Sequence, residues 1–432
     1  MLLLMVSIER TKRKQSEDSY DLTVLTKRIR PSVKSAVLLT KMKFLSLFVK
    51  LPGTIFLLAG LIFILSTSHS LDLHQSFFKF SLSWVFWYPL ALLYFVGVIE
   101  ALLNSSRALQ KFSYWLEERF PNSLSLVLLT SVLGILPAIG GALFSSALVK
   151  NIGEGTSAKD LQLAEINFWF RHFHVFINPL IPGVVLTAAL TEVSIFQLML
   201  VLAPLGVLSF LTGWYWFISP IDFKSTFSWQ PLRLNKSFYI SSFVIFVGTV
   251  LSLLFFKNSL IFFLFWCTGF TAVLSLKILG FKRVVACFVP SAKLLKILWD
   301  VSGVLIFAFM LREGGLNELI LNWTTTSVLP MLFMLSVGIF FMGLITGICH
   351  AYVALLMPIA ALFYSHDPLI IGFLLGVGLS SQFLTPSHLC LIVTSEYFDV
   401  PVKKLIAGCI PPLTVAFVGW SAILAVIYEI WR

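Results

Sequence analysis

The sequence contains few charged residues, and this shortage excludes most classes of soluble protein. Asp, Glu, Lys and Arg account for 12% of the 432 residues, whereas hydrophobic residues account for 58% and the mean hydropathy is +0.94. A soluble domain has about 25% charged residues. The composition therefore predicts an all-α polytopic membrane protein.

Cysteine is also scarce, and catalytic motifs are missing. The five cysteines are isolated in apolar stretches without a CxxC spacing, so the sequence gives no sign of a disulfide framework or a metal centre. It also lacks HExxH, P-loop, GxSxG and dinucleotide-binding motifs. We expect a protein that is not an enzyme, has no cofactor, and uses an ion gradient rather than ATP.

Positive charge is concentrated at one end of the chain. Much of the net charge of +11 lies in a tail at residues 1–43, which we expect to be disordered. A nucleic-acid-binding arm is one interpretation, but a basic cluster directly before a membrane helix more often marks the cytoplasmic side and contacts anionic lipid. We therefore predict a cytoplasmic N-terminus, contacts with membrane lipids and no nucleic acid partner. Met42, directly before the first span, is an alternative start.

Apolar runs locate the membrane-spanning segments, because a helix needs about 20 apolar residues to cross the hydrocarbon core. Two further stretches, 123–149 and 326–364, contain glycine breaks, and the distribution of Lys and Arg requires each to enter and leave on one side. We therefore expect two re-entrant hairpins that enter from opposite faces. The expected spans, about nine, are 51–68, 82–104, 174–191, 194–218, 238–256, 259–280, 293–311, 368–398 and 403–430.

Two interrupted apolar stretches, Leu136–Thr187 and Gly343–Thr394, align without a gap at a constant shift of 207 residues. Corresponding interruptions in two halves of a chain are typical of transporters, whose discontinuous helices form the binding site. We therefore expect two inverted-topology repeats, at residues 44–218 and 293–432, joined by a linker and further spans at 219–292. The alternative is a set of ordinary spans with no internal symmetry.

The first interruption is a glycine pair, Gly140 and Gly141, in one copy and Gly347 in the other. Glycine permits a turn without a Cβ clash, so each hairpin tip could present backbone atoms and nearby hydroxyls to an anion or to a coupling sodium ion. A small-residue packing face is the alternative. The hydroxyls in question are those of Ser145, Ser146 and Thr346.

The second interruption is a proline motif in both copies, Asn178-Pro179 and Thr385-Pro386. Thr and Asn are good N-caps, and Pro is favoured at the first helical position. Each motif therefore predicts a helix that starts inside the membrane. Its free N–H groups and its dipole would stabilise an anion, with help from Ser387 in the second copy. A proline kink without a ligand is the alternative.

Ionisable residues beside these breaks are further candidates, because charges inside a membrane are costly. His350 and His388 could donate to an anion or carry a coupling proton, whereas a neutral histidine held between helices would have no such role. Arg171, His172 and His174, at the entrance of the third expected span, could steer or bind an anion. Basic residues at a cytoplasmic helix end need no such role.

Four motifs resemble those of a known prokaryotic family of integral membrane proteins: Leu136–Ser145, Asn167–His172, Asn178–Gly183 and Thr385–Leu391. That family is domain-of-unknown-function family 401, which is similar to members of the ion-transporter superfamily of gluconate, citrate, dicarboxylate and arsenite carriers. The resemblance covers roughly residues 50–430. It implies inverted repeats with re-entrant hairpins and discontinuous helices, homodimers, and sodium- or proton-coupled movement of anions. The chain lacks the Ser-Asn-Thr hairpin signature of the dicarboxylate carriers.

Together these features predict a secondary active transporter of a small anion, such as an organic acid, in a prokaryotic inner membrane. One alternative is an integral-membrane enzyme or scaffold that uses His350 and His388 on a lipid-phase substrate. A passive anion channel is another. The expected binding residues are Gly140, Gly141, Ser145, Ser146, Asn178, Thr346, Gly347, His350, Thr385, Ser387 and His388.

Overall fold

The computed structural model describes most of the chain after the basic tail. The described residues are 71–106, 120–135, 139–154, 156–179, 181–223, 260–313, 331–347 and 349–431. The expected tail at 1–43, the spans at 51–68 and 238–256, and residues 136–138 of the first expected hairpin lie outside the described residues.

Regular structure in these segments is helical, apart from an isolated bridge between Thr156 and Phe223. The N-terminal helices are α5 (Leu71–Leu82), α6 (Trp84–Ser105), α8 (Asn122–Ile135), α9 (Ile139–Gly153), α10 (Asp160–His172), the 3-10 helix η1 (Phe173–Phe176), α11 (Pro182–Thr191), α12 (Ile195–Gly213) and the π-helix η2 (Trp214–Ile218). The C-terminal helices are α15 (Leu260–Leu279), α16 (Phe281–Cys287), α17 (Ala292–Glu313), α19 (Met331–Thr346), α20 (Cys349–Tyr364), α21 (Pro368–Ser381), α22 (Leu389–Tyr397) and α23 (Val402–Trp431).

Three helices in the described ranges are long and apolar enough to cross a membrane: Gln75–Ser105, Ile195–Ile218 and Val402–Ile430. They confirm three of the expected spans as apolar helices, and α15 and α17 are helical where two more were expected. Large apolar side chains such as Trp266 and Tyr215 are exposed, as lipid-facing residues would be. The chain is an α-helical membrane protein.

Two of the expected spans are interrupted helices, as the proline motifs within them predicted. The segment 174–191 consists of η1 and α11, with a gap between them, and 368–398 consists of α21 and α22. The sequence pattern also missed α10, because Asp160, Gln162 and Glu165 interrupt its apolar face. Hydropathy averages over such breaks, so it detects the apolar length of a segment and not its helical continuity.

The predicted helix starts are wrong by three residues. Helix α11 begins at Pro182 with Ile181 as its N-cap, and α22 begins at Leu389 with His388 as its N-cap. In the second break, the Ser387 backbone N–H donates to Thr385 Oγ1. This local turn replaces a helix start at that position.

The glycine breaks have different outcomes. Gly347 lies between α19 and α20 with a φ of 65°, so the predicted break at this residue is confirmed. Helix α9 begins at Ile139, so Gly140 and Gly141 lie within its first turn rather than at the break itself. Both glycines are therefore helical, and the break predicted at them is not found there.

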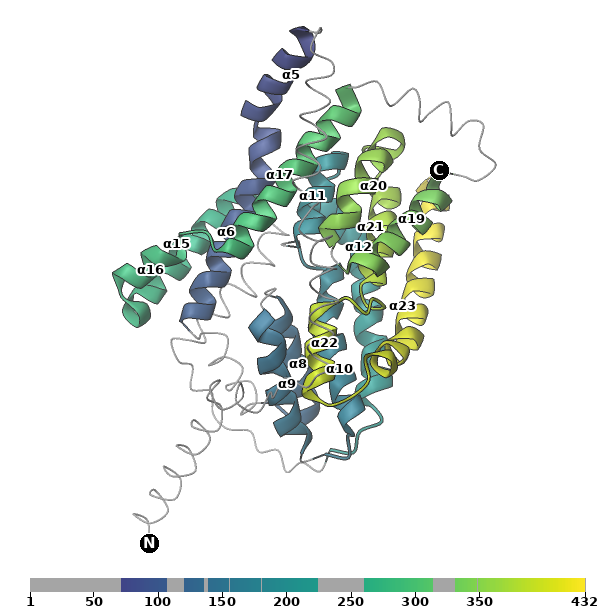
Figure 1. Cartoon of the computed structure of the whole chain (residues 1–432). Helices are drawn as coiled ribbons and strands as arrows, with labels where there is room; N and C mark the ends of the chain where they lie inside the picture. Colours follow the sequence, from purple (N-terminus) through teal and green to yellow (C-terminus); the bar gives the residue numbers. More distant parts are fainter. Residues whose placement is uncertain are drawn as a thin grey trace, which may run out of the picture. The chain divides into compact units, whose positions relative to one another are not determined.

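Helix starts recur along the chain at a nearly constant spacing. The starts of α6, α8, α9, α10, α11 and α12 differ by 207 to 210 residues from those of α17, α19, α20, α21, α22 and α23. Packing is reciprocal: α8 packs on α10 as α19 packs on α21, and α9 packs on α22 as α20 packs on α11. In Figure 1, α8, α9, α10 and α22 lie toward one end of the helix bundle, and α11, α19, α20 and α21 toward the other.

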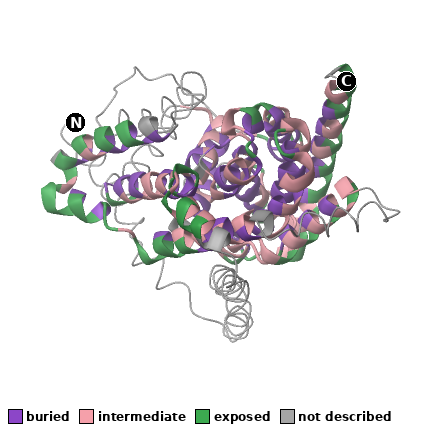
Figure 2. Ribbon diagram, turned by 90° about the horizontal axis from the view of Figure 1, so that it is seen from above, coloured by how far each residue is buried: buried purple, intermediate pink, exposed green. Residues whose placement is uncertain are grey.

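The core lies among α10, α12, α21 and α23, and buried residues gather in the middle of the bundle in Figure 2. Trp169 and Trp420 are fully buried, and their indole N–H groups donate to the Ser209 and Val201 carbonyls of α12 at 2.9 and 2.8 Å. Buried indoles need such partners. Each half therefore contributes one tryptophan that ties a neighbouring helix to α12.

Candidate functional site

Buried polar side chains join three helices at the centre of the candidate site. Asn167 of α10 is fully buried, and its Nδ2 donates to Ser146 Oγ of α9 and to Thr394 Oγ1 of α22, each at 2.9 Å. Ser146 in turn donates to the Ala142 carbonyl within α9. A buried amide has to be paired, so this bond set fixes how the first hairpin and the two broken helices meet.

Arg171 lies one helical turn after Asn167, so both side chains share a face of α10. Its side chain is only 2% exposed, and Nη1 donates to Ser145 Oγ at 3.3 Å. The guanidinium also lies within hydrogen-bonding reach of Cys390, in the first turn of α22. A buried cation is costly unless negative charge or hydrogen-bond acceptors surround it. The site therefore favours negative charge near Arg171.

Two histidines from opposite halves of the chain face each other beside Arg171. His172 Nε2 and His388 Nε2 are 3.0 Å apart, and His172 Nδ1 lies 2.6 Å from the Phe168 carbonyl oxygen. Because a carbonyl can only accept, the proton of this bond sits on His172 Nδ1. The Cys390 thiol completes the group, with all three donor atoms within 4.8 Å of one another. These residues could hold a metal ion.

The loop between α21 and α22 docks on the end of α19. Thr385 Oγ1 donates to the Leu344 carbonyl at 2.5 Å, and Ser387 Oγ donates to the Ile345 carbonyl at 3.2 Å. Gly347 makes this possible, because a Cβ there would lie 2.9 Å from Ser387 Oγ. The second hairpin and the second helix break are thus held together by side-chain bonds to the last turn of α19.

The predicted site residues therefore fall into separate groups. Ser145, Ser146 and His388 belong to the centre around Arg171, whereas Thr385, Ser387 and Gly347 form the loop that leads to it. For the other predicted residues, the structure describes no contact with that centre. Gly140 and Gly141 lie in the first turn of α9, Asn178 is buried between η1 and α11, the Thr346 hydroxyl donates to Met342 of its own helix, and His350 lies within electrostatic range of Lys296 on α17.

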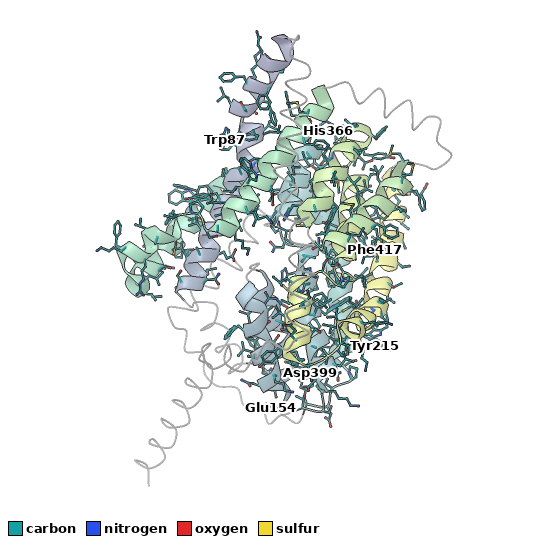
Figure 3. The ribbon with its side chains drawn as sticks, in the orientation of Figure 1. Trp87, Glu154, Tyr215, His366, Asp399 and Phe417 are labelled. Atoms are coloured by element: carbon teal, nitrogen blue, oxygen red, sulfur yellow. The ribbon has the colours of Figure 1, made fainter. Side chains whose placement is uncertain are left out.

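Residues of the second break are partly exposed. Pro386 is exposed, and Ser387, His388 and Cys390 are half-buried, although they lie between helices that pack in the core. Figure 3 places Asp399, which follows α22, and His366, which precedes α21, toward opposite ends of the bundle. The segment that contains the second break therefore runs from one end of the bundle to the other.

Comparison with known families agrees with the motifs. The family model described as a protein of unknown function (DUF401) matches residues 32–427, which is nearly the whole chain. The chain belongs to the DUF401 family. No curated protein matches it. The wider link of this DUF401 protein to the ion-transporter superfamily stays a prediction.

Sequence reasoning missed several residues of the centre in this DUF401 protein. Arg171 and His172 do lie at a helix end, that of α10, but Arg171 is buried and His172 half-buried next to the start of α22. Their position in an apolar aromatic stretch is the signal that could have selected them, since such charges are rarely tolerated without a role. The residues left out of the predicted set are Asn167, Arg171, His172, Cys390 and Thr394.

Proposed function

We propose that this DUF401 protein is a secondary active transporter of a small anion, driven by a sodium or proton gradient through alternating access. The observation that carries the proposal is the buried guanidinium of Arg171, 2% exposed, beside the start of a half-helix. The positive charge of Arg171 favours an anionic substrate, and an organic acid with one or more carboxylates fits the guanidinium best. Arginine binds carboxylates through paired, planar hydrogen bonds.

The start of α22 adds a second source of positive potential. Its N-cap residue, His388, makes no side-chain capping bond, and the helix begins next to Arg171. The first turn of a helix has N–H groups without helical partners and carries the positive end of the dipole. An anion held between this turn and the guanidinium would receive hydrogen bonds from both.

Alternating access would follow from the relation between the halves. We propose that α6 to α12 and α17 to α23 are two inverted repeats, with α8–α9 and α19–α20 as re-entrant hairpins. In support, each hairpin packs against the second half-helix of the other repeat, α9 on α22 and α20 on α11. A movement of one repeat against the other would change which side of the membrane reaches the anion.

The hydrogen bonds also bear on the coupling ion. Ser145 and Ser146 donate to the Ala142 carbonyl and accept from Arg171 and Asn167, respectively. A sodium ion at Ser145 would lie next to a guanidinium, and the neutral hydroxyl ligands there carry no negative charge to offset the repulsion. We therefore propose that these hydroxyls orient Arg171 and Asn167 toward the anion. The coupling ion would then be a sodium ion bound elsewhere or a proton.

Counterflow in proteoliposomes tests the proposal. Wild-type protein, preloaded with each member of a carboxylate panel, should exchange at least one of them for its labelled form. Arg171→Gln should lower that exchange by at least about tenfold, because a hydrogen bond to a charged group is worth about 1.5–3 kcal/mol. Arg171→Lys, which keeps the charge and loses the planar fork, should retain part of it.

Arg283→Gln is the matched control, since Arg283 is exposed on α16, and it should leave exchange unchanged. Equal exchange by wild type and folded Arg171→Gln would contradict the proposed role of Arg171. Inertness of folded wild-type protein toward every anion in the panel would count against transport itself. Thermal melting of each variant in detergent identifies the folded ones.

A membrane enzyme is a second candidate because Cys390 lies within hydrogen-bonding reach of His172 and His388. A thiol beside a histidine is an arrangement used in nucleophilic catalysis. This alternative predicts product formation from a lipid-phase substrate without any gradient, abolished by Cys390→Ala. A transporter would instead exchange its solute and leave its chemistry unchanged.

A further inference from the structure

We propose that His172, His388 and Cys390 form a site for a zinc ion at the junction of α10 and α22. The three side chains come from both halves of the chain, and their donor atoms lie within 4.8 Å of one another. No sequence motif indicates these three ligands, because His172 and His388 are 216 residues apart. Only the fold brings the three ligands together.

The geometry is close to that of a tetrahedral site. A zinc ion bound at about 2.0–2.1 Å to nitrogen and about 2.3 Å to sulfur keeps its donor atoms about 3.3–3.8 Å apart. The two Nε2 atoms are 3.0 Å apart. Because all three donor atoms lie within 4.8 Å of one another, side-chain shifts of about 1 Å would bring them to the spacing of a zinc site.

His172 is already oriented as a metal ligand. Its Nδ1–H donates to the Phe168 carbonyl oxygen at 2.6 Å, so in the neutral ring the lone pair is on Nε2 and faces His388. Zinc-bound histidines characteristically donate their other ring N–H to a carbonyl or carboxylate in this way. The rings of Phe168 and Phe383 pack against the histidines.

Cys390 is placed to be a thiolate ligand. It lies in the first turn of α22 and within hydrogen-bonding reach of Arg171. A helix N-terminus and a neighbouring cation both favour the thiolate over the thiol. On binding, the thiol proton is released and a sulfur–zinc bond forms. Thiolate and imidazole ligands favour zinc over sodium, magnesium or calcium, which prefer oxygen.

Three protein ligands leave one tetrahedral position open, as in zinc sites that bind a further ligand. A carboxylate of the transported anion would occupy it, next to Arg171. This last step rests on the proposed transport function, whereas zinc binding itself does not. The alternative for the pair is a direct Nε2–H hydrogen bond between two neutral histidines, with no ion.

Metal content and cobalt spectroscopy of the purified full chain in detergent test the site. After removal of metal and incubation with ZnCl2 and then dialysis, wild type should retain zinc stoichiometrically, and Cys390→Ala and His388→Ala should not. Cobalt chloride should give the intense visible bands of a tetrahedral site and a thiolate-to-cobalt charge-transfer band in the near ultraviolet. Cys390→Ala should remove the charge-transfer band.

Cys267→Ala is the matched control, because Cys267 is a buried cysteine on α15, and it should behave as wild type. If wild type retains no more zinc than Cys390→Ala, or binds cobalt without the charge-transfer band, the site is overturned. The wild-type spectrum decides this even where a variant fails to fold. Neither readout depends on transport. Zinc binding without any anion exchange would therefore reject only the transport proposal. Anion exchange by a protein that binds no zinc would reject only the metal site.

Discussion

Asn167 and Thr394 are 227 residues apart in the chain, and the Asn167 side chain donates to the Thr394 hydroxyl at 2.9 Å. The same amide nitrogen donates to Ser146. Asn167 Oδ1 is buried and has no hydrogen-bond partner among the described residues. One side chain therefore connects a hairpin helix with both broken helices, and retains an acceptor that a ligand carrying a hydroxyl could use.

Removing this connection should destabilise the protein. Asn167→Ala leaves the buried hydroxyls of Ser146 and Thr394 without their shared donor, and we expect a loss of about 1–3 kcal/mol. Thr394→Val removes one of the two bonds and should cost less. The control is Thr414→Val, whose exposed hydroxyl bonds only its own helix. Thermal melting in detergent measures all three, and equal melting of Asn167→Ala and wild type would refute the bridging role.

A glycine on α21 should be replaceable only at a cost. A Cβ at Gly378 would lie 2.3 Å from the ring of Tyr352, which is fully buried and has no room to move. Overpacking of this kind costs about 1–3 kcal/mol, so Gly378→Ala should lower the melting temperature. Gly269→Ala is the control, since a Cβ at Gly269 would meet no neighbouring atom within 4 Å. If both variants melt alike, the packing argument fails.

The tip of the second hairpin should resist substitution for a different reason. Gly347 has a φ of 65°, and a Cβ there would also crowd Ser387. A residue with a side chain in this left-handed conformation loses about 1–2 kcal/mol. Gly347→Ala should therefore lower both the melting temperature and anion exchange. Gly338→Ala in the same hairpin, where only the flexible end of Leu356 lies near, should affect neither.

The proposed inverted topology makes a labelling prediction. Single cysteines at Asp399 and Glu154 should react with a membrane-impermeant maleimide from the cytoplasmic side, and a cysteine at His366 from the outer side. These positions are exposed, and Figure 3 places Asp399 and Glu154 toward one end of the bundle and His366 toward the other. Intact cells and inside-out vesicles provide the two sides. Labelling of all three from one side would rule out the inverted arrangement.

Much of the helical framework was predictable from composition and local pattern. The lengths of apolar runs located the helices that include α6, α12 and α23, because a helix that crosses a bilayer needs a run of consecutive apolar residues. Gly347 marked a break for an equally local reason, since only glycine takes a positive φ without strain. Proline marked the other breaks but not their ends, because the bonds of Thr385 and Ser387 shift the start of α22 to Leu389.

By itself, then, the sequence determined that this is a helical membrane protein, where its apolar segments run, and where their continuity is at risk. The tertiary structure alone decided which polar residues meet. It brings Asn167 to Thr394 and His172 to His388, and it buries Arg171 beside the start of α22. The physical reason is that hydrophobicity and backbone strain act on neighbouring residues, whereas a hydrogen bond or a ligand site depends on packing between helices that are distant in the chain.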